Sequence, residues 1–311
     1  MRLLFLGAGA TGGYFGGQLA KAGVDVTFLV RPKRRDQLAR DGIKIEGPLG
    51  NVTTPVKAIT REEIVGPFDT VILSAKAYDL ADAIETIRSA VGENTLVLPI
   101  LNGLKHLEHL DDVFGAPRVF GGTCHISATL GDDGTIRQFG PFASITQGPR
   151  LPEQKTASAK LHDVLVRGFE ARHPDDIVAA MWDKWFFIAA LASSTCLMRA
   201  TVGEIIRTGR GPEFMADVLN ECVAVATANG YSPQAATLEL MRPLLMDPKS
   251  TMSASMLRDI QRGGRIEADQ IVGDMIQRGR AHTVPTPLLE TAYIHLQAYQ
   301  NRIAANQPAV G

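Results

Sequence analysis

The first thirteen residues, MRLLFLGAGATGG, restrict the possible folds of this chain more than any other stretch. An apolar run ends at Leu6, and Gly7, Gly9 and Gly12 then follow the pattern G-x-G-x-x-G. Because 30 of the 311 residues are glycine, the bare pattern is weak and its context decides its meaning. The motif ends a predicted strand, opens a helical stretch and precedes a second apolar strand, which is the order of a dinucleotide-binding unit.

We expect the backbone of this segment to bind the pyrophosphate of a dinucleotide, because N–H groups and the helix dipole at a helix N-terminus favour anions. The alternative is a glycine-rich turn that binds nothing. The residues of the predicted site are Gly7, Ala8, Gly9, Ala10, Thr11 and Gly12.

The rest of the first half alternates apolar runs with amphipathic ones. Strands that are apolar throughout predict a parallel sheet covered on both faces. The predicted strands are residues 2–7, 25–31, 69–77, 94–103 and 118–127, with helices at 12–23 and 79–92. Residues 133–140 and 142–148 predict a hairpin that closes the sheet. From Ile177 onward the pattern is helical.

The fold class is therefore α/β, with an N-terminal Rossmann-type doubly wound sheet followed by an all-helical C-terminal domain. We expect a nucleotide-binding domain over residues 1–174 and a helical substrate and catalytic domain over residues 175–311, with the active site between them.

Composition excludes several classes of partner. Thirty-two Lys and Arg residues against 33 Asp and Glu residues argue against a nucleic-acid-binding or membrane-binding surface. No apolar run approaches the ~20 residues that span a bilayer, and the N-terminus lacks a signal-peptide core. Cys124, Cys196 and Cys222 are scattered and lack metal spacing, which predicts reduced thiols in a cytoplasmic protein without a metal site. We expect a monomer or homodimer.

The cofactor preference depends on the end of the second strand. Arg31 stands there, where a carboxylate would select NAD, and a guanidinium can bind a 2′-phosphate through two hydrogen bonds. Arg31 therefore favours NADP(H). The three basic residues behind it, Lys33, Arg34 and Arg35, are predicted to form a solvated loop.

Two further polar residues lie just past the ends of sheet strands, where ligands of α/β sheets bind. Lys76 can add a positive charge near the adenosine phosphate, and Asn102 can bind the nicotinamide ribose or the substrate. Taken alone, Lys76 also fits a surface lysine, and Asn102–Gly103 also fits a simple turn.

Lys184 is the candidate catalytic residue of the second half. Between Ile177 and Met198 the only charged residues are Asp183 and Lys184, on a helix that is apolar on every side. As neighbours about 100° apart the two do not readily pair, so Lys184 must reach solvent, a distant carboxylate or a ligand. It fits either a proton donor or a lysine whose head lies in water. Glu267 stands where a helical pattern restarts. It fits either a carboxylate partner for Lys184 or a negative charge that suits the dipole at a helix N-terminus.

These motifs together resemble the ketopantoate reductase (2-dehydropantoate 2-reductase) family over essentially the whole chain. The matching stretches are GAGATGG, Arg31, AKAYD, LNG, GGTCHIS, WDKW, SMLRDIQRG with EAD, and RAHTVPTP. The resemblance implies NADPH-dependent reduction of a 2-oxo acid to the 2-hydroxy acid, by family 2-dehydropantoate to pantoate in the pantothenate pathway.

The resemblance also implies roles for the substrate-side residues. Lys184 corresponds to the lysine that gives a proton to the ketone oxygen as hydride reaches carbon. Glu267 corresponds to the glutamate that contacts cofactor or substrate and orients this lysine. Asn102 corresponds to the asparagine that bridges ribose and substrate, and Ser255 to a serine that binds the substrate carboxylate.

On the cofactor side, Arg31 and Lys76 match the pair that selects the 2′-phosphate. Ser127 falls where the family makes a backbone contact to the cofactor.

The chain departs from the family pattern on the helix of the lysine. Four and eight residues after Lys184, where the family has two substrate-binding asparagines, stand Ile188 and Ala192. Because a pocket that loses a hydrogen-bond donor binds a hydroxyl poorly, these residues favour an apolar branched or aromatic 2-oxo acid. A D-2-hydroxyacid dehydrogenase is therefore an alternative function. A non-catalytic NADPH-binding redox sensor is another, although a sensor needs neither Lys184 nor Glu267.

Overall fold

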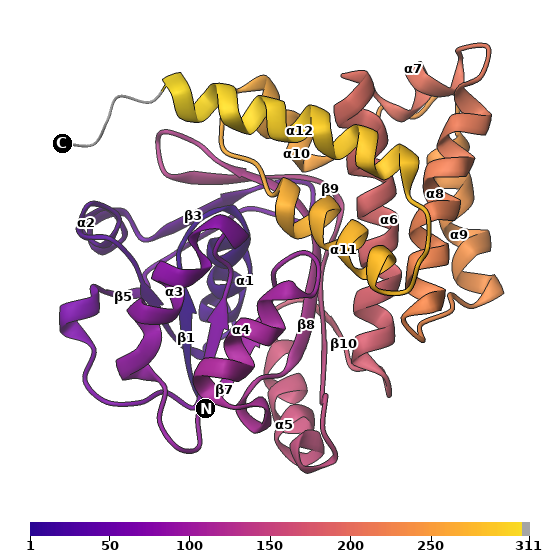
Figure 1. The fold of residues 1–311 in the computed structure, drawn as a ribbon. Helices are drawn as coiled ribbons and strands as arrows, with labels where there is room; N and C mark the ends of the chain where they lie inside the picture. The colour runs from indigo at the N-terminus through magenta and orange to yellow at the C-terminus, as the bar shows by residue number, and fades with distance from the viewer. Residues whose placement is uncertain (307–311) are drawn as a thin grey trace. The chain divides into compact units, whose positions relative to one another are not determined.

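The computed structural model describes residues 1–306 and divides the chain into two compact units (Figure 1). The first unit holds residues 1–101 and 106–180, and the second holds residues 102–105 together with the chain from Met181 onward. The domain boundary expected at residue 174 stays a prediction. The division by contacts follows Ala180 and assigns the short segment 102–105 to the second unit.

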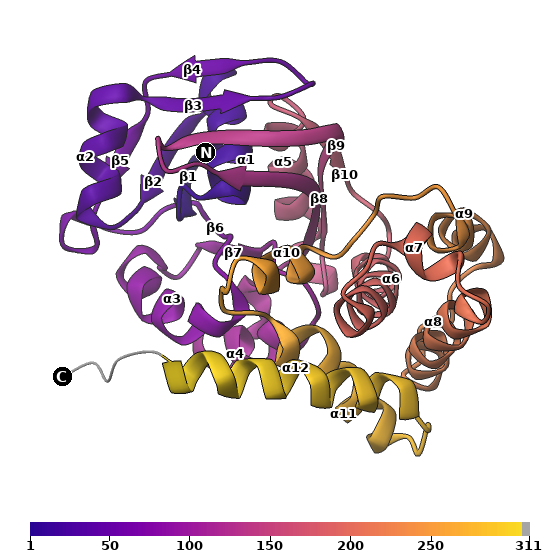
Figure 2. The ribbon, with the colours of Figure 1, turned by 90° about the horizontal axis from the view of Figure 1, so that it is seen from above.

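The first unit contains a five-stranded sheet in which every pairing is parallel. Its order is β5 (Lys57–Ile59), β2 (Asp25–Leu29), β1 (Arg2–Leu6), β6 (Thr70–Leu73) and β7 (Leu96–Pro99). Helix α1 (Ala10–Lys21) covers one face, and α3 (Leu80–Ile87) and α4 (Lys105–Phe114) lie on the other (Figure 2). The predicted Rossmann-type sheet is confirmed, except that the stretch 118–127, expected as one of its strands, leads into β8 (Gly121–Leu130) of a second sheet.

A second sheet lies on the far side of α1. It joins β10 (Glu170–Arg172), β9 (Thr135–Gly148), β3 (Ile43–Glu46) and β4 (Val52–Thr54), and β8 (Gly121–Leu130) pairs with β9. Helix α5 (Lys155–Leu165) packs against β9 and β10. The sequence patterns did not reveal β3, β4, β5 or β10.

Glycines let α1 fit between the two sheets. A Cβ on Gly16 would lie 2.6 Å from Phe28 of the first sheet, and one on Gly13 would lie 2.5 Å from Ile136 of the second. Gly17 approaches Ile45 in the same way. The glycine-rich sequence of this helix therefore serves close packing as well as the turn before it.

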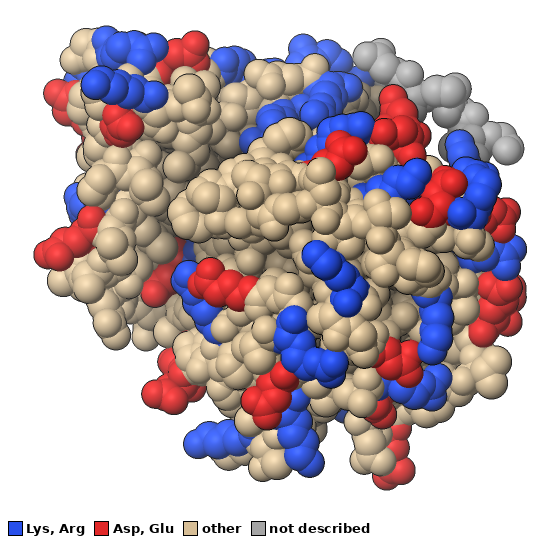
Figure 3. All heavy atoms as spheres, turned by 180° about the vertical axis from the view of Figure 1, so that it is seen from behind, with Lys and Arg blue, Asp and Glu red and all other residues tan. Residues whose placement is uncertain are grey.

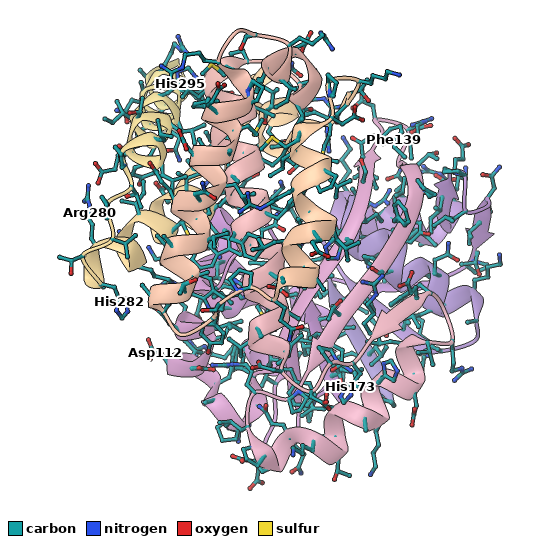
Figure 4. The ribbon with its side chains drawn as sticks, turned by 90° about the vertical axis from the view of Figure 1, so that its right-hand side faces the viewer. Asp112, Phe139, His173, Arg280, His282 and His295 are labelled. Carbon is teal, nitrogen blue, oxygen red and sulfur yellow. The ribbon has the colours of Figure 1, made fainter. Side chains whose placement is uncertain are left out.

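The hairpin predicted from residues 133–140 and 142–148 is wrong, because residues 135–148 form the single strand β9. The partner of β9 in the antiparallel pairing is β8, and the register jumps from Ile126–Ala143 to Ala128–Gln138. Residues 139–142 (FGPF) therefore bulge out opposite Ser127. The Gly-Pro signal marks this bulge, whose Phe139 is labelled in Figure 4, and not a chain reversal.

The basic segment behind Arg31 is also corrected. Residues 32–41 form helix α2 (Pro32–Asp41), with proline in its first turn. Arg34 is half-buried and donates hydrogen bonds to the carbonyl oxygens of Ala8 (3.0 Å) and Gly134 (3.1 Å). It therefore holds the glycine-rich turn and is not part of a solvated loop.

The second unit is helical throughout its described residues, which confirms the predicted class. After α6 (Ile177–Met198), which begins in the first unit, come α7 (Val202–Ile206), α8 (Gly211–Ala228), α9 (Ala235–Met246), α10 (Ser255–Gln261), a π-helical turn (Asp269–Gly273), α11 (Asp274–Ala281) and α12 (Pro287–Asn306).

Helix α6 carries the core of this unit. Trp182, Trp185 and Phe186 are at most 2% exposed. Within residues 1–306 it is the one helix long and apolar enough to span a membrane, but 67% of that apolar window is buried, as in a core helix of a globular protein. On the face drawn in Figure 3, basic and acidic side chains are interspersed, in keeping with the net charge of −1.

We predict that the three thiols react slowly with Ellman's reagent in the native protein. All three cysteines are buried, and burial raises the pKa of Cys196 to about 12 and also raises the pKa of Cys222, so little reactive thiolate forms at these two residues. Native protein should release much less than one equivalent of product within minutes, and protein unfolded in guanidinium should release three. Rapid reaction of one native thiol would contradict this burial.

Candidate active site

The glycine-rich turn lies where the connections of the parallel sheet change direction. From β1 the chain builds β2 and β5 on one side and β6 and β7 on the other. Gly7 follows the end of β1, where Leu6 pairs with Leu29 and Leu73 of the neighbouring strands. This switch point at the carboxyl ends of the strands is the usual ligand site of open α/β sheets.

The turn has the space and the free backbone groups that an anion needs. Gly7 has φ +92°, and a Cβ on Gly12 would clash with the Ser74 hydroxyl and lie 2.7 Å from the Gly7 carbonyl oxygen. A Cβ on Gly9 would have no atom within 4 Å. Helix α1 begins without a side-chain cap or an acidic residue in its first turn. The segment therefore fits a dinucleotide pyrophosphate.

Two of the other predicted cofactor residues, Arg31 and Lys76, lie at the same edge of the sheet. Arg31 is exposed at the start of α2, two residues past β2, and Lys76 is half-buried three residues past β6. Because β2 and β6 flank β1, these cations follow the strands on either side of the glycine-rich turn. Ser127 is half-buried in β8, opposite the bulge in β9.

In the second unit, the structure brings Lys184 and Asn102 into direct contact. The lysine Nζ donates a hydrogen bond to Asn102 Oδ1 at 2.9 Å, and the lysine is only 8% exposed. Its neighbour Asp183 accepts from the Thr237 hydroxyl at 3.5 Å, and burial raises the pKa of Asp183. The lysine is thus held at the edge of an apolar helix by an amide oxygen.

The main chain of Asn102 accepts a second hydrogen bond, from Gln270. Gln270 Nε2 donates to the Asn102 carbonyl oxygen at 2.8 Å. Gly103 has φ +74°, and a Cβ there would lie 2.8 Å from the Gln270 carbonyl oxygen. The Asn-Gly pair therefore forms a tight turn and also presents a side chain to Lys184, and its binding of the ribose or the substrate stays a prediction.

Glu267 lies two residues before the π-helical turn (Asp269–Gly273) that carries Gln270. It is 7% exposed, and its carbonyl oxygen accepts from the Ile271 N–H at 3.0 Å. Trp185, beside Lys184 on α6, donates its indole N–H to the Ile271 carbonyl oxygen at 3.0 Å. The π-helical turn is therefore bound to α6 next to the lysine.

The remaining predicted substrate residues lie further along α6. Ile188 is half-buried and Ala192 is 2% exposed, four and eight residues after Lys184 and so on its side of the helix. Thr195 Oγ1 accepts from the Ala254 N–H at 3.3 Å, which attaches the start of α10 to this helix. Ser255, the first residue of α10, is exposed.

Sequence comparison assigns both halves of the chain to one family. The family description "Ketopantoate reductase PanE/ApbA" matches residues 3–151, and its C-terminal counterpart matches residues 176–300. The chain is 33% identical to the uncharacterized oxidoreductase YkpB of Bacillus subtilis, over 96% of this chain and 99% of that protein. The chain belongs to the ketopantoate reductase family.

Solved structures agree with this assignment to the ketopantoate reductase family. A 2-dehydropantoate 2-reductase from Geobacter metallireducens superposes with a TM-score of 0.87 at 27% identity, covering 96% of this chain and 99% of that one. A D-mandelate dehydrogenase solved with NADH and anilino(oxo)acetate also gives a TM-score of 0.87, at 22% identity, covering 98% and 99%. At that identity the second likeness shows the fold alone.

Sequence reasoning missed several residues that support the site of this ketopantoate reductase family member. Gln270 had no recognisable signal, because a buried amide can satisfy its hydrogen bonds anywhere in a core. Trp185 belongs to the WDKW stretch, but no local pattern indicates the partner of its indole N–H. Arg34 was misassigned to a solvated loop. A proline in the first helical position was the available signal for helix α2.

Proposed function

We propose that this protein reduces a 2-oxo acid to the 2-hydroxy acid with NADPH. The observation that carries the proposal is the buried ammonium of Lys184, held 2.9 Å from the Asn102 side-chain oxygen. A carbonyl that is being reduced develops negative charge on oxygen, and a positioned ammonium both stabilises that charge and supplies the proton.

The first unit supplies the cofactor site. The backbone of residues 7–12 fits the pyrophosphate, Arg31 and Lys76 are the cations for a 2′-phosphate, and Ser127 offers a backbone contact. When bound, NADPH supplies the hydride. The first residues of α1 donate N–H groups, and their fixed direction orients the bound dinucleotide.

The second unit supplies the proton and holds the substrate. Lys184 donates the proton to the substrate oxygen, and the Asn102 amide aims the ammonium. Glu267, buried beside the π-helical turn, orients the lysine and contacts cofactor or substrate. The exposed Ser255 hydroxyl binds the substrate carboxylate. A sensor would need neither the lysine nor the glutamate.

For the substrate, the family favours 2-dehydropantoate, with the product pantoate feeding the pantothenate pathway. The half-buried Ile188 favours the alternative, a D-2-hydroxyacid dehydrogenase for an apolar branched or aromatic 2-oxo acid, because it offers no partner to the substrate hydroxyl of 2-dehydropantoate. A cytoplasmic monomer or homodimer remains the prediction.

We predict that NADPH binds at least ~10-fold more tightly than NADH, because a charge-assisted contact between Arg31 and the 2′-phosphate is present only with NADPH. Arg31→Ala should weaken NADPH and leave NADH unchanged in fluorescence titrations. Lys33→Ala, at an exposed neighbouring cation, is the matched control and should change neither. Equal dissociation constants of the wild type for the two cofactors would show that Arg31 does not select the phosphate.

Lys184→Ala should lower kcat for ketone reduction by ~10²-fold or more, because the proton donor is lost. The dissociation constant of NADPH should stay unchanged. Lys249→Ala removes an exposed lysine of the same unit and should keep full activity. Turnover of Lys184→Ala close to that of wild type would remove this lysine from the mechanism.

Ile188→Asn should raise kcat/KM for 2-dehydropantoate relative to phenylglyoxylate by about tenfold, because the new amide can bond the substrate hydroxyl. The double variant with Ala192→Asn tests the second position, and its melting temperature must be checked because Ala192 is buried. Ile294→Asn, on the exposed side of α12, is the control. An unchanged ratio in both variants would mean that this helix face does not line the pocket.

A further inference from the structure

We infer that Gln270 is a positioning residue, which acts on Lys184 by holding Asn102. This inference rests on the proposed reduction and adds to it a residue that touches neither substrate nor cofactor in the proposed roles. Its basis is the 2.8 Å hydrogen bond from the Gln270 amide to the Asn102 carbonyl oxygen, on the residue whose side chain accepts from Lys184.

The contacts form a closed ring. Lys184 donates to the Asn102 side chain at 2.9 Å, and the Asn102 main chain accepts from Gln270 at 2.8 Å. The next residue after Gln270, Ile271, accepts from the indole of Trp185 at 3.0 Å, and Trp185 follows Lys184 on α6. The ring closes on α6, because Lys184 and Trp185 are neighbours in one turn of that helix. A shift of Gln270 therefore moves Asn102 relative to the lysine.

A π-helical turn is well suited to carry these contacts. Wide turns of this kind break the regular hydrogen-bond ladder and are frequent at functional sites. Here the Ile271 carbonyl oxygen binds Trp185. On the outer side, the Tyr293 hydroxyl donates to Asp269 at 2.6 Å, and its ring packs against Gly273. The turn that carries Gln270 is thus braced on both sides.

The Asn-Gly turn needs such a clamp. Gly103 has a positive φ, and the backbone lies so close to Gln270 that a Cβ would meet its carbonyl oxygen at 2.8 Å. Only residues 102–105 of the first half of the chain belong to the second unit. This short segment therefore depends on its contacts with the helical unit to keep Asn102 at the lysine.

The Trp185 side of the ring is rigid. The rings of Trp182 and Trp185 lie 4.7 Å apart, and the Arg278 guanidinium is 5.6 Å from the Trp185 ring centre. Trp185 is 1% exposed. An indole held by this packing is a fixed donor to the Ile271 carbonyl oxygen, so the backbone that carries Gln270 is fixed to α6.

Gln270→Glu and Gln270→Met test the inference, because both keep the length of the side chain and remove the donor to Asn102. The control is Gln277→Glu, an exposed glutamine in the following helix α11. We expect kcat to fall about tenfold in both Gln270 variants, since small misplacements of a catalytic group are costly. KM for NADPH should stay unchanged, and Gln277→Glu should behave as wild type.

Hydrogen exchange provides a readout that needs no substrate. In the Gln270 variants the peptide covering residues 101–106 should exchange about tenfold faster, while peptides of α8 stay as in the control. Unchanged kcat would overturn the inference, even with faster exchange, because Gln270 would then serve the fold alone. A parallel loss of NADPH binding would also overturn it. Should wild type reduce no 2-oxo acid, the proposed function fails, and exchange still decides whether Gln270 holds Asn102.

Discussion

The hydrogen bonds to Asn102 are the contacts on which the arrangement of the catalytic half depends. One residue accepts the lysine ammonium on its side chain and the Gln270 amide on its main chain, at 2.9 and 2.8 Å. Buried polar groups are stable only when they are paired, so a displacement of Asn102 breaks both of these hydrogen bonds at once. The core helix α6 can carry a lysine because the turn at Asn102 supplies its partner.

The fold could be predicted largely from sequence because its strongest signals are local. The parallel sheet was indicated by the glycine motif after β1 and by the apolar runs 2–7 and 25–31. The second unit was indicated by the helical spacing of apolar residues after Ile177. The error at residues 133–148 has a physical cause. Gly140 and Pro141 give the signal of a reversal, yet a bulge satisfies the same backbone preferences inside one strand.

The candidate site was only partly predictable. Lys184 and Asn102 could be proposed from sequence because a lone cation on an apolar helix and an amide past a strand end are unusual. Their contact depends on a long-range pairing, 82 residues apart, that no local pattern encodes. Gln270 is 168 residues from Asn102 in the sequence. Its role emerges only when the π-helical turn and the Asn-Gly turn pack together.

The same helix that holds the lysine also carries the departure at Ile188 and Ala192. Because these residues follow Lys184 at intervals of four, they lie on its side of α6, and Thr195 continues that side to the start of α10. In the proposed reaction, proton donation depends on Lys184 and the residues that hold it, whereas recognition of the substrate side chain is assigned to the next two turns of α6. The proposal therefore assigns the chemistry and the choice of 2-oxo acid to different turns of one helix, so that a change at Ile188 is expected to alter the second without disturbing the lysine.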